Sequence, residues 1–198
     1  MESVTLAEAA HAMGATTVGA RTTDAFPTGA SIDTRTLREG DVFFAIPGER
    51  TDGHRFVPDA LEGGAAAVVV SDPGVAESAA GPALVVDDTI AALQRLAGWY
   101  RERFDLPVVA VTGTNGKTTT KDMAAAVLST RMKTLKTEGN YNNHIGVPLT
   151  LLRLSSADEV AVVEIGMNHP GEITELARMA VPETGVITNI GPAHLETM

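Results

Sequence analysis

The stretch VVAVTGTNGKTTTKDM, residues 108–123, places a buried strand, a glycine-containing turn and a helix in direct succession. Residues 108–111 are small or β-branched and apolar, which is typical of a strand at the centre of a parallel sheet. A helix is predicted over residues 118–130. The glycines between them, Gly113 and Gly116, let backbone N–H groups approach an anion at the positive end of that helix. The order strand, turn, helix therefore predicts a phosphate-binding loop.

This loop departs from the usual G-x-x-x-x-G-K-[ST] pattern, because Val111 stands where the first glycine is expected. The N–H groups that the chemistry needs lie after Val111, so we assign this residue to the strand. Lys117 is predicted to reach the β- and γ-phosphates, and the Thr118 hydroxyl to bind Mg²⁺. An ordinary βα turn with a solvated lysine is the alternative, and the presence of strand, turn and helix together favours phosphate. The predicted phosphate contacts are Gly113, Thr114, Asn115, Gly116, Lys117, Thr118 and Thr119.

Two further strands are predicted to end at the same edge of this sheet. Residues 160–165 form an apolar run that contains Glu164, and residues 185–189 form another that is followed by His194. In open α/β sheets, ligands bind outside the carboxyl ends of the strands. Glu164 is therefore predicted to take part in metal or phosphate chemistry, with a plain surface acid as the alternative. For His194 the pattern leaves a ligand role and a structural role equally open.

The first hundred residues also read as an α/β unit. Strands are predicted at 41–46, 66–70 and 83–86, and helices at 5–13, 56–62 and 88–104. Thr5 and Glu8 predict a capping box at the start of the first helix. Asp105-Leu106-Pro107 marks the predicted boundary. We therefore expect an α/β protein in which a small N-terminal domain, residues 1–105, precedes the first part of a P-loop-type parallel-sheet domain, residues 106–198, with a further helix at 173–180.

Composition limits the class of protein. The chain has 198 residues, 44% of them hydrophobic, enough to build a core, and it contains no cysteine. A net charge of −10 and an aromatic content of 4% argue against a nucleic-acid surface. The N-terminus lacks the basic start and continuous apolar run of a signal peptide, and no run is long enough to span a membrane. These features predict a cytoplasmic protein that does not bind nucleic acid and does not insert into a membrane.

Four motifs, in order, resemble the Mur ligases of peptidoglycan synthesis: TGTNGKTTT (112–120), GNYNNHIGVPLTLL (139–152), EIGMNHPGEI (164–173) and NIGPAHLE (189–196). The segment SIDTRTLREGDVFFAIPGER (31–50) resembles the N-terminal domain of the family. The second and third motifs resemble the member that joins D-alanyl-D-alanine to UDP-N-acetylmuramoyl-tripeptide. The alternative is the related ligase that adds the third amino acid, which usually carries a threonine pair where Asn142 and Asn143 stand.

The resemblance implies that ATP activates a carboxylate as an acyl phosphate, which an amine then attacks. It implies catalytic roles for Lys117, Glu164 and His194, with one Mg²⁺ held by Thr118 and Glu164 and a second Mg²⁺ held by His194. It also implies substrate contacts by the asparagines and by the N-terminal segment, where Asp33 is expected to orient Arg35 rather than touch an anion. Turn chemistry and a surface ion pair are the alternatives there. The implied substrate contacts are Ser31, Asp33, Thr34, Arg35, Ala45, Gly48, Asn140, Asn142 and Asn143.

The chain stops soon after a strand-like run, with no helix to complete the unit. We therefore expect a fragment that lacks the carbamylated lysine and the C-terminal domain of the family, inactive alone and monomeric when full length. Two other classes stay open. A P-loop switch should carry an Asp-x-x-Gly segment, whereas the matching strand here ends Glu-Ile-Gly-Met-Asn. An isolated UDP-sugar-binding module would bind the sugar nucleotide without ATP.

Overall fold

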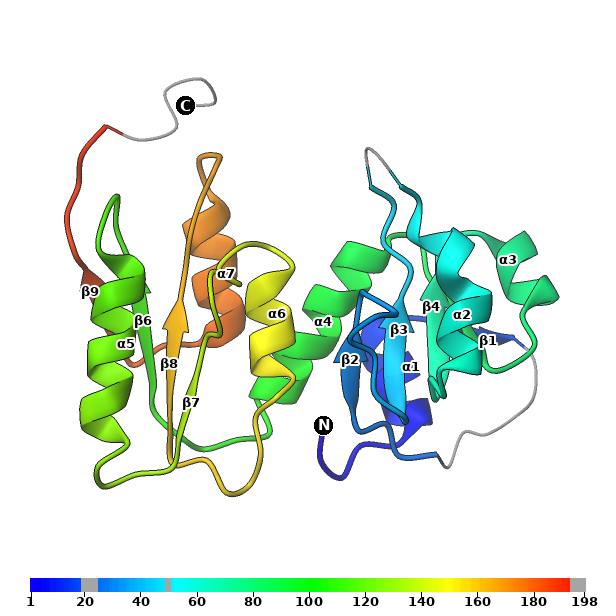
Figure 1. The fold of residues 1–198 in the computed structure, drawn as a ribbon, viewed down its shortest axis with the longest axis horizontal. Coiled ribbons are helices and arrows are strands. Elements are labelled where there is room, and N and C mark those ends of the chain that lie inside the picture. The colour runs from blue at the N-terminus through cyan, green and yellow to red at the C-terminus, as the bar shows by residue number, and fades with distance from the viewer. Residues whose placement is uncertain (19–24, 49–50, 193–198) are drawn as a thin grey trace. The chain divides into compact units, whose positions relative to one another are not determined.

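A computed structural model describes residues 1–18, 25–48 and 51–192 (Figure 1). By its internal contacts the chain divides into two compact units, Met1–Leu96 and Ala97–Met198, and the division falls within helix α4 (Thr89–Arg101). The sequence-based boundary after residue 105 stays a prediction for the two functional domains. His194 lies outside the described residues.

The first unit contains a five-stranded sheet in the order β1-β5-β4-β3-β2. Strands β2 to β5 run parallel, and β1 pairs antiparallel with β5. Its strands are β1 (Thr16–Val18), β2 (Gly29–Ser31), β3 (Asp41–Phe44), β4 (Ala67–Val70) and β5 (Ala83–Val85), and its helices are α1 (Leu6–Met13), the 3₁₀ turn η1 (Gly53–Phe56), α2 (Val57–Glu62), α3 (Pro73–Ser78) and the first part of α4.

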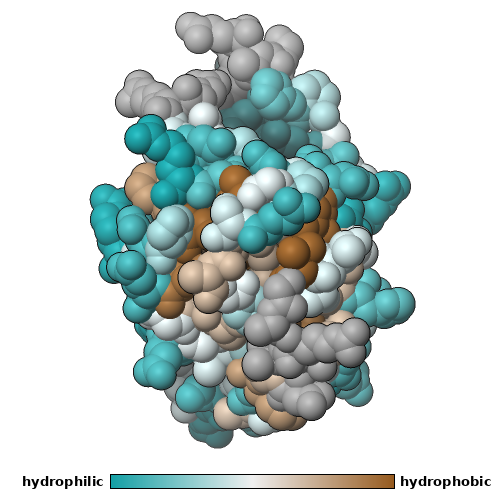
Figure 2. Space-filling view, turned by 90° about the vertical axis from the view of Figure 1, so that its right-hand side faces the viewer, coloured by the Kyte–Doolittle hydropathy of each residue, from teal (hydrophilic) through white to brown (hydrophobic). Residues whose placement is uncertain are grey.

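Local signals start and stop the first helix as the sequence predicts. The Thr5 side chain accepts from the Glu8 N–H and the Glu8 carboxylate accepts from the Thr5 N–H, which completes the capping box. Gly14 ends α1 in the left-handed conformation at φ 69°. Helices α2 and α3 bury Val57, Ala60 and Ala76 against alternate residues of β3, β4 and β5. Figure 2 shows one outer face of the molecule, where hydrophilic side chains border a smaller set of hydrophobic ones.

The second unit contains a four-stranded, wholly parallel sheet in the order β7-β8-β6-β9. All four carboxyl ends therefore meet at one edge. Val111 of β6 pairs with Glu164 of β8, and Thr112 pairs with Ile187 of β9. The elements are β6 (Val108–Thr112), α5 (Lys117–Leu128), β7 (Thr134–Lys136), α6 (Gly146–Leu151), β8 (Val160–Glu164), α7 (Glu172–Ala180) and β9 (Thr184–Ile187).

Helices cover both faces of this sheet (Figure 1). Helix α5 packs Ala125 against Val111 and Val162, and α6 and α7 contact each other and the strands β8 and β6. At the end of α4, the buried Arg101 guanidinium donates to four backbone carbonyls, including those of Ala180 and Leu106. These bonds tie α4 to the end of α7.

Several boundaries differ from the sequence-based ones. Helix α4 ends at Arg101, so Phe104 lies beyond it and meets the Tyr100 ring edge-on at 5.0 Å. Strands β1, β2 and β7, at three residues each, and helices α3 and α6, at six each, have no counterpart among the predicted elements. Within the part of the chain that the structure describes, every helix is too short or too polar to traverse a lipid bilayer.

Candidate phosphate and metal site

The phosphate loop joins β6 to α5 and depends on two glycines. Gly113 has φ 130°, and a Cβ there would lie 2.2 Å from the Thr188 hydroxyl oxygen. Gly116 is the N-cap of α5 at φ 80°. The first bond of α5 runs from the Thr120 N–H to the Gly116 carbonyl, so the N–H groups of the first helical residues precede the hydrogen-bonded ladder and remain free for an anion. Gly113 leaves no room for a Cβ, and the positive φ of Gly116 favours glycine.

Lys117 opens α5 and turns back over the loop. Its ammonium donates to the carbonyls of Gly113 at 2.7 Å and Thr114 at 3.2 Å. The positive charge therefore lies above the turn that the sequence assigns to phosphate. Thr118 and Thr119 follow on the exposed start of the helix, so their hydroxyls are accessible.

The segment after β9 holds the loop in shape, which the sequence did not reveal. The Asn115 N–H donates to the Asn189 side-chain oxygen at 2.9 Å, and the Thr188 hydroxyl donates to the Asn115 carbonyl at 2.6 Å. Thr114 exchanges two bonds of 3.0 Å with the backbone of Gly191 through its hydroxyl. Because these groups are already bonded, the free N–H groups lie from Gly116 onward.

Glu164 ends β8 with its side chain only 1% exposed. One carboxylate oxygen, Oε1, accepts from the Asn142 amide at 2.8 Å, and the Glu164 N–H donates to the Thr137 hydroxyl at 2.9 Å. The other oxygen, Oε2, is buried and has no hydrogen-bond partner among the described residues. A buried carboxylate oxygen without a donor is costly, and a cation would compensate for that cost.

The three asparagines predicted to contact substrate differ in what they do. Asn142 binds Glu164 as described above. The Asn143 side-chain oxygen accepts from the N–H groups of Ile145 and Gly146 at 3.2 and 2.8 Å, so it caps the start of α6. The Asn140 side chain is exposed. Asn142 and Asn143 therefore have structural partners within the chain, and substrate contact by the three stays a prediction.

Lys121 is a charged residue that the sequence reading missed. It lies one turn after Lys117 on α5, its side chain is 1% exposed, and its ammonium is 3.9 Å from Glu164 Oε2. The same ammonium donates to the Gly139 carbonyl at 3.2 Å and lies 3.5 Å from an Asp122 oxygen. Asp122 also binds Lys136 at 2.6 Å, and this bond is the main reason why the Asp122 pKa is lowered from its ordinary value.

The residues present fit one magnesium ion, although they do not form a complete cage. No group of three or more His, Asp or Glu side chains able to hold a metal occurs in the described ranges, which exclude His194. Glu164 Oε2 offers an unsatisfied buried oxygen, and Thr118 offers an exposed hydroxyl. Mg²⁺ usually combines one or two protein oxygens with phosphate oxygens and water, which suits this donor set.

In the first unit, the predicted substrate residues gather after β2. The Asp33 carboxylate binds Arg35 through both oxygens, with Nε at 2.9 and 3.1 Å. This pairing is the main reason why the pKa of Asp33 is lowered. The Arg35 side chain is 86% exposed, and its Nη2 also donates to Asp33 Oδ2 at 2.5 Å. Ser31 is buried and its hydroxyl donates to the Asp33 carbonyl, and Thr34 is half-buried. The expected orientation of Arg35 by Asp33 is present.

The second predicted segment lies after β3. The Ala45 side chain is fully buried, and its N–H donates to the Val69 carbonyl, which leaves only its carbonyl for a ligand. Gly48 is exposed, and its N–H donates to the Thr51 carbonyl. The His54 ring binds Asp52 through Nδ1 at 2.7 Å, and its Nε2 accepts from the Ser71 N–H at 2.9 Å. His54 is therefore structural here.

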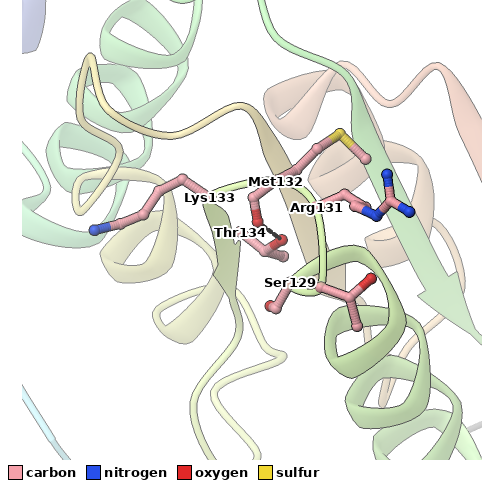
Figure 3. A pocket seen from close by; sticks show the side chains of 6 residues that line it. Ser129, Arg131, Met132, Lys133 and Thr134 are labelled. Atoms are coloured by element: carbon pink, nitrogen blue, oxygen red, sulfur yellow. Dashed lines mark hydrogen bonds between the residues drawn. The ribbon is translucent and has the colours of Figure 1, made fainter.

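A hollow of about 500 Å³ lies where α5 passes to β7, at the amino ends of the strands. Figure 3 shows the side chains that line it, with the Thr134 hydroxyl bonded to the Met132 carbonyl. The phosphate loop is at the opposite ends of the strands, so this hollow is separate from the site. Its lining consists of Ser129, Thr130, Arg131, Met132, Lys133 and Thr134.

A parallel sheet with a strand–loop–helix phosphate site and a buried acid on the neighbouring strand defines the class of P-loop-type α/β proteins. Comparison of the sequence with models of protein families identifies the family within this class. Residues 27–101 match the model described as Mur ligase family, catalytic domain, and residues 111–198 match the Mur ligase middle domain. The chain belongs to the Mur ligase family.

Among curated relatives, the UDP-N-acetylmuramoyl-tripeptide–D-alanyl-D-alanine ligase of Bacillus subtilis is 49% identical over 172 residues, 86% of this chain and 37% of the relative. The enzyme of that name from Escherichia coli is 45% identical over 99% of this chain and 42% of the relative. The chain thus spans about two fifths of these relatives.

Solved structures show the same likeness. A crystal structure of MurF from Acinetobacter baumannii matches with a TM-score of 0.88 at 37% identity, covering 98% of this chain and 42% of that one. MurF from Thermotoga maritima in complex with ADP matches with a TM-score of 0.75 at 36% identity, covering 84% of this chain and 38% of that one.

Proposed function

We propose that this chain carries the sugar-nucleotide and ATP-binding parts of a ligase that joins D-alanyl-D-alanine to UDP-N-acetylmuramoyl-tripeptide. The observation that carries the proposal is the buried Glu164, with one unsatisfied oxygen, on the strand next to the phosphate loop. Relatives named for this reaction, one of them bound to ADP in its structure, support the choice over the ligase of the third amino acid.

The reaction needs two anions, a carboxylate and a triphosphate, to meet. The free N–H groups at the start of α5 and the Lys117 ammonium would hold the β- and γ-phosphates and offset their charge. Thr118 and Glu164 would hold one Mg²⁺ and His194 a second, and these ions would neutralise phosphate charge when bound. The substrate carboxylate would attack the γ-phosphorus and ADP would leave. The amine would then attack the acyl carbon, release phosphate and lose a proton, which leaves the new amide.

The remaining contacts follow from the same proposal. Gly113, Thr114, Asn115, Gly116 and Thr119 would shape the phosphate loop in a nucleotide domain of residues 106–198. Asn140, Asn142 and Asn143 would face the peptide end of the substrate. In residues 1–105, Arg35 would pair with the pyrophosphate of UDP, supported by Ser31, Asp33, Thr34, Ala45 and Gly48. We place the whole protein, as a monomer, in the cytoplasm in peptidoglycan synthesis, which cell shape and division require.

Calorimetric titration of the chain with Mg-ADP and with UDP-N-acetylmuramoyl-tripeptide tests the proposal. We expect Lys117→Ala to weaken Mg-ADP binding by about tenfold or more, because one charge-assisted phosphate contact is lost. Its affinity for the UDP ligand should not change. Lys133→Ala is the matched control, since this exposed lysine lines the hollow at the opposite sheet edge.

The two titrations also separate the rival classes. UDP-ligand binding without any Mg-ADP binding would favour an isolated sugar-nucleotide module. Mg-ADP binding with no recognition of the UDP ligand would favour a nucleotide switch. Equal Mg-ADP affinities of wild type and Lys117→Ala would remove Lys117 from the phosphate site.

A further inference from the structure

Two fully buried charges of opposite sign lie beside the phosphate loop. Lys121 and Glu164 each expose 1% of their side chains. Burying an ammonium or a carboxylate is expensive, and it persists only where partners compensate for the lost water. The partners of the Lys121 ammonium therefore indicate its role.

The contacts of the Lys121 ammonium leave Glu164 Oε2 without a hydrogen bond from any described residue. The ammonium donates to the Gly139 carbonyl at 3.2 Å and lies 3.5 Å from an Asp122 oxygen and 3.9 Å from Glu164 Oε2. At 3.9 Å it compensates the charge of Oε2 without forming a hydrogen bond to it. Asn142 occupies only the other oxygen, Oε1. Oε2 thus keeps its lone pairs for another ligand while a fixed positive charge stands nearby.

The two lysines of the first turns of α5 have different surroundings. Lys117 is half-buried and bonded to the loop carbonyls, whereas Lys121 is buried and held by Gly139 and Asp122. Lys121 is thus anchored from two sides at a place where it acts on the carboxylate and not on the loop. Charges alternate along the row Lys136, Asp122, Lys121 and Glu164, so each one is offset by its neighbour.

We propose that Lys121 is a positioning residue that acts as a fixed counter-charge for Glu164. This inference rests on the proposed magnesium role of Glu164. Lys121 offsets the charge of the carboxylate and keeps it oriented while no divalent cation is bound. Its charge also repels a lone cation, so the cation binds well only together with the nucleotide phosphates, whose negative charge outweighs the lysine.

Cation binding in the absence of nucleotide tests this role. Mn²⁺ is the probe, and its free concentration is measured by electron paramagnetic resonance. We expect Lys121→Met to bind Mn²⁺ alone about tenfold more tightly than wild type, because a like charge next to the site is removed. In chelator the same variant should melt at a lower temperature, and Mn²⁺ should raise its melting temperature more than that of wild type.

Lys136→Met is the matched control. It removes the same charge from the same row, but Lys136 is half-exposed and contacts Asp122 rather than Glu164. Its Mn²⁺ affinity should equal that of wild type. Equal Mn²⁺ affinities in all three proteins would overturn the role of Lys121, as would an equal gain in both variants.

If Lys121→Met does not fold, the double variant Lys121→Met/Glu164→Gln, which removes both charges, tests the pairing instead. A folded double variant beside an unfolded single one supports the pairing, whereas two unfolded proteins would show that Lys121 acts independently of Glu164. An ADP titration separates this inference from the proposed function. Wild type that binds no ADP defeats the proposed function, whereas ADP binding with unchanged Mn²⁺ affinity in Lys121→Met defeats only the counter-charge role.

Discussion

Replacing Asn142 by aspartate would put a second carboxylate against Glu164 with almost no change of shape. The Asn142 amide donates to Glu164 Oε1 at 2.8 Å, and Asn142→Asp turns that donor into an acceptor. Two carboxylates this close would repel by about 6 kcal/mol at an effective dielectric constant of about 20. One of them should therefore take up a proton, so that the protonated acid again donates the hydrogen bond.

The free-energy cost of protonating a carboxylate at pH 7 sets an upper limit to the loss of stability. An ordinary glutamate pKa of about 4.3 lies about 2.7 units below pH 7, which corresponds to at most about 3.7 kcal/mol. Asn142 is half-buried, so solvent screens part of the repulsion, and we expect a loss of about 3 kcal/mol at pH 7. The folded variant holds a proton that the unfolded chain lacks. Because the pKa of this carboxyl is raised in the folded variant, the loss of stability is small at low pH. Above about pH 4.5, the difference in unfolding free energy from wild type grows by up to about 1.4 kcal/mol per pH unit.

Denaturant unfolding followed by circular dichroism, in chelator and between pH 4.5 and 8, measures this dependence. The neighbouring variant Asn143→Asp is the control, because the Asn143 oxygen already accepts two backbone N–H groups and a carboxylate accepts them equally well. Its stability should match wild type or exceed it. If the difference in unfolding free energy between Asn142→Asp and wild type were independent of pH, the contact between residues 142 and 164 would not be as described.

Other predictions concern single groups. Gly113→Ala should abolish Mg-ADP binding in calorimetry and lower the melting temperature, because its Cβ would lie 2.2 Å from the Thr188 oxygen. Arg101→Met should lower the free energy of unfolding by about 3 kcal/mol in denaturant titrations, since buried carbonyls lose their donor; no loss would contradict this. Thr89→Val should be neutral or stabilising by up to about 1 kcal/mol in the same assay, because the buried Thr89 hydroxyl has no partner among the described residues. The Glu172 pKa is lowered chiefly by the Asn168 N–H. The stability that the ionised Glu172 carboxylate contributes is therefore present above the ordinary glutamate pKa and is lost as the pH falls through the pKa of the folded protein. The melting temperatures of wild type and Glu172→Gln should therefore converge in acid.

The sequence predicted the parts of the fold that are encoded locally. The strand before Gly113, the turn and α5 follow one another between Val108 and Leu128, so their pattern is complete in one stretch. The position of Glu164 also followed, because an acid at the end of an apolar strand must lie at the carboxyl edge of a parallel sheet. In contrast, helix α3 was not predicted, although Asp72 as N-cap and Pro73 at the first helical position begin it.

Contacts between distant segments could not be predicted from the sequence. Asn142 and Asn143 are adjacent and identical, yet one binds Glu164 and the other caps α6. Nothing in the local pattern distinguishes them, because the difference comes from where β8 lies. Lys121 was missed because a lysine on a helix is normally solvated, and only the packing of α5 against β8 shows that this one is buried.

The bonds between the phosphate loop and the segment after β9 also bear on how the protein folds. Thr188, Asn189 and Gly191 reach loop residues that are 73 to 77 positions earlier in the chain. Contacts of such long sequence separation form late, since the intervening chain must first be ordered. During synthesis on the ribosome the glycine turn is therefore made early but acquires its final shape only after β9 has emerged and docked. Nucleotide should accordingly favour the completed sheet over its partly folded precursors.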